Sequence, residues 1–233
     1  MNTAIIAAAG AGTRMASDRP KQFLLLAGTP VLIHTLKVFE QCESIHEVIV
    51  VLPAEESAGF LSLAGKFGLR KVARVVPGGI TRADSVKRGL SAIRAATAEI
   101  VVVHDGVRPF VTVEEIDAAV TAAQSDGAAI LVAPVTDTIK QVSDQRVERT
   151  LDRGVLRRAL TPQCFRYELL RQAYLAADVT DASLTDESVL VEKLGIPISV
   201  IDGNPRNIKI TTVADLAIAE AMLTADVTDW NRD

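Results

Sequence analysis

The chain has 233 residues, of which 48% are hydrophobic and 23% are charged, and its formal net charge is −4. This length suits one larger α/β domain with a buried core, and no second domain is required. Because the charge is negative and no Lys/Arg block occurs, nucleic acid is excluded as the main partner. No apolar run approaches the roughly 18 residues of a membrane span. Two cysteines and no charged-then-apolar leader are expected of a cytoplasmic, reduced protein.

The first predicted element is a buried strand at 3–9 that runs into a loop of small residues, Ala7-Ala8-Ala9-Gly10-Ala11-Gly12-Thr13-Arg14-Met15. Small residues let backbone N–H groups approach phosphate oxygens closely. The spacing matches neither a P-loop nor, since Met15 replaces the third glycine, a dinucleotide fingerprint. With Arg14 and Lys21 as cations, the pattern predicts a nucleoside triphosphate cradle. From spacing alone, two solvent-exposed cations remain the alternative.

The middle of the chain alternates apolar runs of strand length with helical patterns. We expect strands near 47–52, 71–76, 99–103 and 128–134, and amphipathic helices with apolar residues at 32, 36 and 39 and at 116, 120 and 123. Thr112 with Glu115 predicts a capping box, and 81 with 84 and 212 with 215 predict looser versions. This alternation is typical of a single Rossmann-like α/β domain over 1–233, with a mostly parallel twisted sheet flanked by helices.

Polar residues stand where two of these elements begin or end. Asp105 follows an apolar run, so we expect it at the carboxyl end of a central strand, where open α/β sheets bind ligands. It could hold a ribose or polyol hydroxyl or approach Mg²⁺, and the alternative is a loop-capping carboxylate. Ser85, at a helix start after Gly79, suits recognition of a base, although a serine there is more often ordinary helix-start polarity. His34 and His104 are expected to be structural.

Residues 136–152 interrupt the succession of strands and helices. Apolar and polar residues alternate there around a Ser-Asp-Gln turn, and the segment is too polar for a core strand. We expect a β-hairpin arm that projects from the domain. An isolated hairpin is marginally stable, so the arm should pack on a second copy of the chain in a two-fold dimer. The residues after about 224 lose the helical period and are expected to fray.

A series of motifs from residue 3 to about 223 resembles the nucleotidyltransferases of the sugar-nucleotide type, and more narrowly the 2-C-methyl-D-erythritol 4-phosphate cytidylyltransferase family. The motifs are Ala-Ala-Gly-x-Gly-x-Arg-Met at 8–15, Pro-Lys-Gln at 20–22, Gly-Gly at 78–79, Arg-Ala-Asp-Ser-Val at 82–86, His-Asp-Gly-Val-Arg-Pro at 104–109, Ala-Pro-Val-x-Asp-Thr-x-Lys at 133–140, Asp-Arg at 152–153, Leu-Thr-Pro-Gln at 160–163, Thr-Asp-Glu at 185–187 and Asn-Ile-Lys at 207–209. The one departure is Gly106-Val107, where the family pattern leads us to expect Ala-Ala or Ala-Val.

The resemblance implies transfer of CMP from CTP to 2-C-methyl-D-erythritol 4-phosphate in isoprenoid precursor synthesis. It implies Mg²⁺ as cofactor, with no residue assigned as its ligand, and a homodimer with exchanged arms and shared active sites. The catalytic residues would be Arg14, Lys21, Arg153 and Lys209. The CTP site would comprise Ala8, Ala9, Gly10, Gly12, Arg14, Lys21, Gly79, Ser85 and Asp105. The polyol phosphate site would comprise Asp105, Arg108, Thr138, Arg153, Thr161, Thr185 and Lys209.

The implied reaction agrees with the residue types. A phosphate nucleophile is already anionic at neutral pH, so the reaction needs cations around phosphorus and no general base. Without the resemblance, surface pairing of Arg153 with a carboxylate and an outward position of Lys209 on an edge strand are favoured. A ribitol 5-phosphate cytidylyltransferase is the nearest rival. A non-catalytic nucleotide- or dinucleotide-binding module is disfavoured, because the second strand ends in Leu52-Pro53 and lacks an acidic residue for a ribose.

Overall fold

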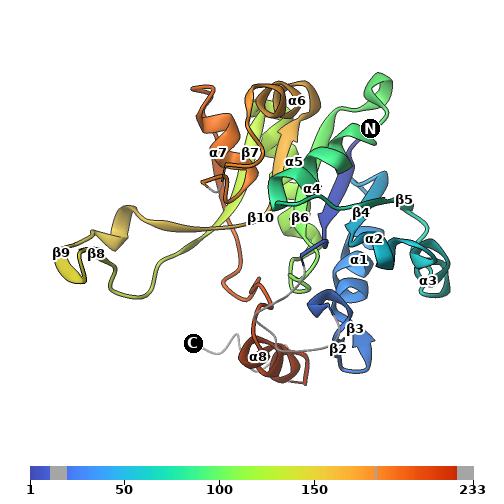
Figure 1. Cartoon of the computed structure of the whole chain (residues 1–233), viewed down its shortest axis with the longest axis horizontal. Coiled ribbons are helices and arrows are strands. Elements are labelled where there is room, and N and C mark those ends of the chain that lie inside the picture. Colours follow the sequence, from blue (N-terminus) through green and yellow to red (C-terminus); the bar gives the residue numbers. More distant parts are fainter. Residues whose placement is uncertain (11–19, 182, 225–233) are drawn as a thin grey trace.

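The computed structural model describes residues 1–10, 20–181 and 183–224. Among them, seven strands form a twisted sheet in the order β11-β7-β10-β6-β1-β4-β5 (Figure 1). All neighbours in this sheet are parallel except β10, which runs antiparallel to both β6 and β7. The strands are β1 (Thr3–Ala7), β4 (Glu47–Leu52), β5 (Val72–Pro77), β6 (Ile100–Asp105), β7 (Ala128–Pro134), β10 (Arg157–Arg166) and β11 (Ser199–Asp202).

The five predicted strands and the mostly parallel sheet are confirmed, whereas β10 and β11 were not predicted. β10 begins with two exposed arginines and contains Pro162 and Gln163, which disfavour a central strand in a sequence pattern. It is nevertheless buried from Leu160 to Phe165, because it is inserted between β6 and β7 with a shift in its register to β7. β11 is a four-residue edge strand and is too short to give a clear alternation.

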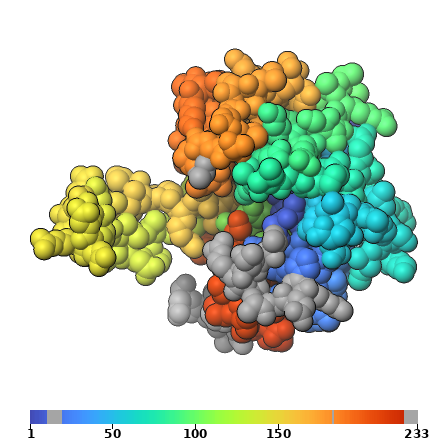
Figure 2. All heavy atoms as spheres, in the orientation of Figure 1, coloured from blue at the N-terminus to red at the C-terminus, as the bar shows by residue number. Residues whose placement is uncertain are grey.

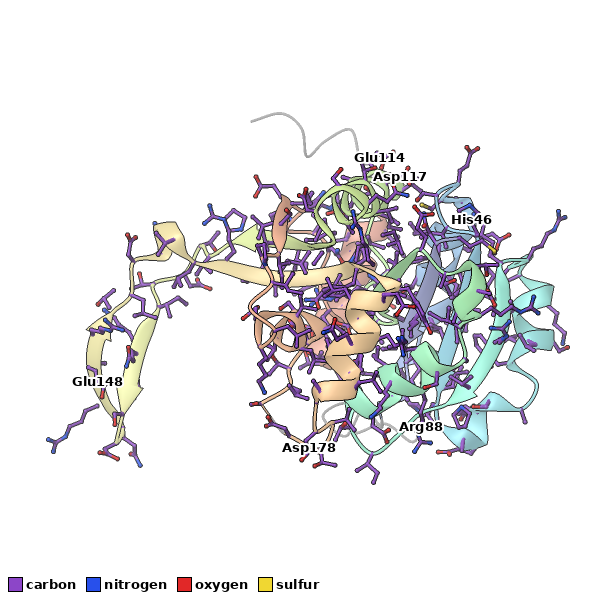
Figure 3. The ribbon with its side chains drawn as sticks, turned by 90° about the horizontal axis from the view of Figure 1, so that it is seen from above. His46, Arg88, Glu114, Asp117, Glu148 and Asp178 are labelled. Carbon is purple, nitrogen blue, oxygen red and sulfur yellow. The ribbon has the colours of Figure 1, made fainter. Side chains whose placement is uncertain are left out.

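Helices cover both faces of the sheet. One face packs against α1 (Val31–Gln41), α3 (Phe60–Lys66) and α5 (Val113–Asp126), and the other against α4 (Arg82–Ser91), α6 (Tyr167–Ala176) and α7 (Glu187–Glu192). The strands serve both layers because alternate side chains point to opposite faces, as Ala4 and Ile6 do relative to Ile5. Figure 3 shows this division, with Glu114 and Asp117 of α5 opposite Arg88 of α4.

Smaller elements complete the body of the domain. The short helix α2 (Ala54–Ser57) follows β4. The hairpin β2 (Leu25–Leu26) and β3 (Thr29–Pro30) and helix α8 (Val213–Thr224) enclose a separate small core below the sheet. Residues 225–233, which the sequence predicts to fray, lie outside the described residues.

Local signals mark the helix starts as predicted. Thr112 and Glu115 form a capping box, with Thr112 N donating to Glu115 Oε2 at 2.9 Å and Glu115 N to Thr112 Oγ1 at 3.2 Å. Thr212 and Asp215 exchange the same two bonds at 2.8 and 3.2 Å. These reciprocal bonds satisfy N–H groups that a helix start leaves without intrahelical partners.

The predicted arm is confirmed as a hairpin of β8 (Lys140–Ser143) and β9 (Arg146–Thr150). It projects from the body of the domain (Figures 1 and 2), and all residues of both strands are exposed. The turn residues Asp144 and Gln145 have φ of 47° and 61°, which suits the right-handed twist of a two-residue hairpin turn. Val142 and Val147 are 56% and 62% exposed, so the arm carries apolar surface that its own domain does not cover.

Within the described parts of the chain, none of the helices has the length and apolar character that crossing a membrane requires.

Candidate functional site

Two adjoining clefts lie at the carboxyl ends of β1 and β6. The main cleft, of about 310 Å³, is lined among the described residues by Ala7, Ala8, Ala9, Gly10, Lys21, Gln22, Gly79, Ile80, Thr81, Arg82, Ser85, Asp105, Val107 and Lys209. The side cleft, of about 110 Å³, is lined by Arg82, Asp105, Arg108, Ala159, Leu160, Thr161, Gln163, Thr185, Asp186 and Lys209. Arg82, Asp105 and Lys209 belong to both and form the junction between the clefts.

The wall of the main cleft opposite β1 is a loop at 78–81 whose first two positions, Gly78 and Gly79, leave no room for a Cβ. A Cβ on Gly78 would overlap the Ala9 methyl, and a Cβ on Gly79 would overlap the Asp84 side chain. Ser85, 4% exposed, accepts a hydrogen bond from Gly79 N at 3.0 Å and donates one to Thr81 O at 2.9 Å. At Gly78 and Gly79 the wall therefore consists of backbone, and the Ser85 hydroxyl is hydrogen-bonded to the loop at Gly79 N and Thr81 O.

Thr81, and not Ser85, caps the helix that begins here. Its hydroxyl accepts from Asp84 N at 3.0 Å, which confirms half of the predicted pair. The Asp84 carboxylate accepts from Ile80 N at 3.1 Å and does not complete a capping box. Ile80, fixed by that bond, is 93% exposed and lines the main cleft. The helix α4 consequently begins at the cleft and presents its N-terminus there, which favours anions.

Asp105 is the centre of charge at the junction. It is 5% exposed, and its Oδ1 pairs with Arg82 Nε at 3.2 Å, while its Oδ2 pairs with Arg108 Nε at 3.1 Å and Lys209 Nζ at 3.0 Å. Burial alone would raise the pKa of this carboxyl, but Arg82, Lys209 and Arg108 hold its pKa well below the usual range. Asp105 is therefore ionised and gathers three cations where the clefts meet.

A buried hydrogen-bonded chain supports Asp105 from behind. Thr161 Oγ accepts from Asp105 N at 3.2 Å and lies 3.0 Å from His104 Nδ1, and His104 Nε2 lies 3.1 Å from Arg108 O. A backbone carbonyl only accepts, so Nε2 carries the hydrogen and Nδ1 accepts from the Thr161 hydroxyl. Burial lowers the pKa of His104 to about 4, which keeps the ring neutral. The structural role predicted for His104 is confirmed, as it is for His34, whose Nε2 lies 2.8 Å from Leu26 O.

Most of the predicted site residues come together here. The main cleft collects Ala8, Ala9, Gly10, Lys21, Gly79, Ser85, Asp105 and Lys209, and the side cleft Asp105, Arg108, Thr161, Thr185 and Lys209. Gly12 and Arg14 lie outside the described residues. The outward edge-strand alternative for Lys209 is wrong, because 207–210 forms no strand and Lys209 pairs with Asp105. The roles of these residues in binding or catalysis stay predictions.

Two predicted site residues line neither cleft of their own chain. Thr138 is exposed at the base of the arm, and Arg153, also exposed, donates to the carbonyl of Thr136. Among the described residues Arg153 therefore has a backbone oxygen as its partner and not the carboxylate that the sequence alone favours.

The described residues do not build a metal site of their own. They contain no cluster of three or more side chains of the kinds that hold a metal ion. Asp105 is the one carboxylate among the described residues that line the main cleft, and both of its oxygens are ion-paired. A divalent cation at Asp105 would have to compete with three cationic side chains, so the described residues do not fit a protein-held Mg²⁺.

Arg82 is part of a motif in the sequence, but the sequence assigns it no role. It stands in the run 78–86 that carries the family resemblance and opens α4, yet its sequence neighbours do not reveal its partners. Those partners are Asp105 and Glu187, which lie 23 and 105 residues away. The usable signal was an arginine at a helix start beside a glycine pair, in a segment already predicted to face the ligand.

The chain is similar to known proteins over nearly its whole length. The family model of 2-C-methyl-D-erythritol 4-phosphate cytidylyltransferase matches residues 2–225. A relative of that name from Pelotomaculum thermopropionicum is 46% identical over 224 residues, covering 95% of this chain and 94% of the relative. One from Geobacillus kaustophilus is 44% identical over 220 residues, covering 94% and 96%.

Solved structures agree with these relatives. The 4-diphosphocytidyl-2C-methyl-D-erythritol synthase from Anaerococcus prevotii aligns with a TM-score of 0.82 at 31% identity, over 95% of each chain. The 2-C-methyl-D-erythritol 4-phosphate cytidylyltransferase from Thermus thermophilus aligns with a TM-score of 0.77 at 33% identity, over 94% of this chain and 97% of the other.

Proposed function

The chain belongs to the 2-C-methyl-D-erythritol 4-phosphate cytidylyltransferase family, and we propose that its main cleft binds CTP and its side cleft the acceptor phosphate. The enzyme transfers CMP from CTP to 2-C-methyl-D-erythritol 4-phosphate, in isoprenoid precursor synthesis. An acceptor phosphate oxygen bonds to the α-phosphorus of CTP, the bond from that phosphorus to the β-phosphate oxygen breaks, and pyrophosphate leaves. The products are 4-diphosphocytidyl-2-C-methyl-D-erythritol and pyrophosphate.

The construction of the main cleft carries the assignment to CTP. Ala8, Ala9 and Gly10 bring backbone to the cleft without bulky side chains, and Lys21 adds positive charge beside them. In our proposal Lys21, with Arg14, stabilises the charge that accumulates around phosphorus during transfer. The backbone of Gly79, held by Ser85, reads the polar edge of the base.

The side cleft has the cations that a second anionic substrate needs. Arg108 and Lys209 lie beside Asp105 at the junction, and Thr185 offers a hydroxyl at the start of α7. Without such cations the two phosphates would repel each other. The reaction as we propose it uses no general base, which agrees with the burial of His104 in its neutral form behind the site.

Mg²⁺ enters our proposal as part of the substrate. Nucleotidyl transfer of this type commonly uses the ion on the triphosphate oxygens, where it offsets their charge. Because the one described carboxylate in the main cleft is fully ion-paired, we propose Mg·CTP as the bound species, without a protein carboxylate as an obligatory ligand.

We also propose that two chains exchange arms in a homodimer. The support is the hairpin of β8 and β9, in which every strand residue is exposed among the described residues, Val142 and Val147 included. An isologous interface would carry Thr138 of one chain to the side cleft of the other, whereas Arg108, which pairs with Asp105 of its own chain, stays in its own cleft. Cys42 and Cys164 are both free and buried, which supports action in a reducing cytoplasm.

The test is release of pyrophosphate from Mg·CTP with two acceptors, 2-C-methyl-D-erythritol 4-phosphate and ribitol 5-phosphate. We expect release with the first and a much lower kcat/KM with the second. Preference for ribitol 5-phosphate would replace the acceptor assignment. Binding of Mg·CTP in calorimetry without release from either acceptor would reduce the protein to a nucleotide-binding module.

A further inference from the structure

A single guanidinium joins the two clefts through two buried carboxylates. Arg82, the first residue of α4, lines both clefts. Its Nε donates to Asp105 Oδ1 at 3.2 Å, and its Nη1 donates to Glu187 Oε1 at 2.8 Å and Oε2 at 2.9 Å. Asp105 ends β6, and Glu187 begins α7. Arg82 therefore connects the end of the central strand β6 to the start of α7, which packs on the same face of the sheet as α4.

The Glu187 carboxylate is buried, and its described hydrogen-bond and ion-pair partners are protein side chains. It is 1% exposed, Tyr174 donates its hydroxyl to Oε1 at 3.0 Å, and Arg82 is its one cationic partner among the described residues. Its backbone N–H donates to Gln163 Oε1 at 3.1 Å, and Gln163 Nε2 donates to Asp186 Oδ2 at 3.0 Å. A buried carboxylate with one cation depends strongly on that partner.

The residues just before Glu187 form part of the side cleft. Thr185 and Asp186 line it, and they directly precede Glu187, the ion-pair partner of Arg82, in the chain. A shift of the Glu187 backbone would therefore move these two residues relative to Asp105. Transfer between two phosphates needs the reacting atoms about 3 to 3.5 Å apart, and a misplacement of about 1 Å can cost roughly 10²-fold in rate.

We propose that Arg82 is a positioning residue that sets the distance between the acceptor wall, meaning Thr185 and Asp186, and the nucleotide side at Asp105. It acts through Glu187, so its loss impairs use of the acceptor more than binding of Mg·CTP. The inference rests on the proposed assignment of the two clefts. It adds a role for the Arg82–Glu187–Tyr174 cluster, whose carboxylate touches neither cleft.

The test uses two near-isosteric variants of the full-length enzyme. Glu187→Gln keeps an acceptor oxygen for Tyr174 but removes the charge, and Arg82→Lys keeps the charge but replaces the planar fork, which donates from Nε and Nη1, by a single nitrogen. We expect each to lower kcat/KM for 2-C-methyl-D-erythritol 4-phosphate by about tenfold or more, while the Kd of Mg·CTP in calorimetry changes by less than about threefold. The matched control is Glu168→Gln, which breaks an exposed pair with Arg171 of 2.9 Å and should change neither value.

A double variant tests whether Arg82 acts through Glu187. In Arg82→Lys/Glu187→Gln the loss should equal that of the worse single variant, because one pathway is broken twice. A loss equal to the product of both single losses would overturn the proposal. So would acceptor kinetics equal to wild type in a folded Glu187→Gln protein, or equal losses in Mg·CTP binding and acceptor use.

Two further measurements distinguish loss of folding from loss of positioning. If Glu187→Gln does not fold, Tyr174→Phe removes one hydrogen bond from the same carboxylate, and we expect a smaller loss of acceptor kcat/KM in the same direction. An unchanged value in Tyr174→Phe together with an unchanged Arg82→Lys would then overturn the positioning role. Absence of pyrophosphate release in the wild type would instead refute the proposed function itself.

Discussion

Gly106 provides a sharp test of how tightly the floor of the main cleft is packed. The residue follows Asp105, and a Cβ built on it would lie 2.8 Å from the Ala8 Cβ, 2.9 Å from Leu32 Cδ1 and 3.2 Å from Ile6 Cγ2. Its backbone has no room to retreat, because its N–H donates to Ala7 O at 3.0 Å and its carbonyl accepts from Thr35 at 3.0 Å. The family pattern predicts alanine at this position, but in this chain a Cβ here would come closer than van der Waals contact to Ala8 and Leu32.

We expect Gly106→Ala to destabilise the fold and weaken CTP binding together. Overpacking of this kind costs about 1 to 3 kcal/mol in the free energy of unfolding. For a chain of this size that corresponds to a Tm lower by roughly 2 to 12 °C. Leu32 can relieve its contact by moving its side chain, but the Ala8 methyl moves only with its backbone, which lines the main cleft. A shift there should raise the Kd of Mg·CTP by about tenfold, or 1.4 kcal/mol.

The assay is thermal unfolding followed by circular dichroism, with Mg·CTP titrated by calorimetry in parallel. Gly65→Ala is the matched control, because Gly65 lies within α3 with nothing within 4 Å of the added Cβ. It should stabilise the protein by up to about 1 kcal/mol. A Gly106→Ala protein with wild-type Tm and wild-type CTP affinity would refute the packing argument.

Three further predictions address catalysis, assembly and pH. Lys21→Ala should lower kcat by about 10²-fold or more with a smaller change in the KM for CTP, and a kcat within about threefold of wild type would contradict the proposed charge stabilisation. Equal mixtures of Lys21→Ala and Thr138→Arg chains, inactive alone, should recover about a quarter of wild-type activity after exchange, since half the dimers are mixed and each has one intact site; inactivity of heterodimers seen by native mass spectrometry would contradict shared sites. The unfolded chain protonates His104 near its ordinary pKa of 6.5, whereas the folded chain resists until about pH 4, so the stability from neutral His104 is complete above pH 6.5 and is lost as pH falls toward 4, by up to about 3 kcal/mol. Urea unfolding between pH 7 and 4.5 should show a smaller pH slope in His104→Gln, and an equal slope would contradict this; the depressed pKa of Asp105 acts only below its ordinary value of 3.8, outside that range.

Local patterns in the sequence determined much of the architecture. The apolar runs of β1, β4, β5, β6 and β7 and the capping pair at Thr112 are short-range signals, and each is present in the structure. The alternation of polar and apolar residues over 136–152 predicted the arm because the segment is too polar for a strand that is buried on both faces. Asp105 could be placed at the ligand edge, because parallel strands bring their carboxyl ends to one side.

Only the tertiary structure decided which charges meet at that edge. β10 pairs with β6 and β7 through long-range backbone contacts. These contacts outweigh the low strand preference that its two leading arginines and Pro162 give the segment. The same folding brings Arg82 to Glu187 across 105 residues and Lys209 to Asp105 within 3.0 Å. No periodicity encodes such pairs, because the free energy of a buried ion pair depends on burial and distance, and both exist only after the sheet and its helices have assembled.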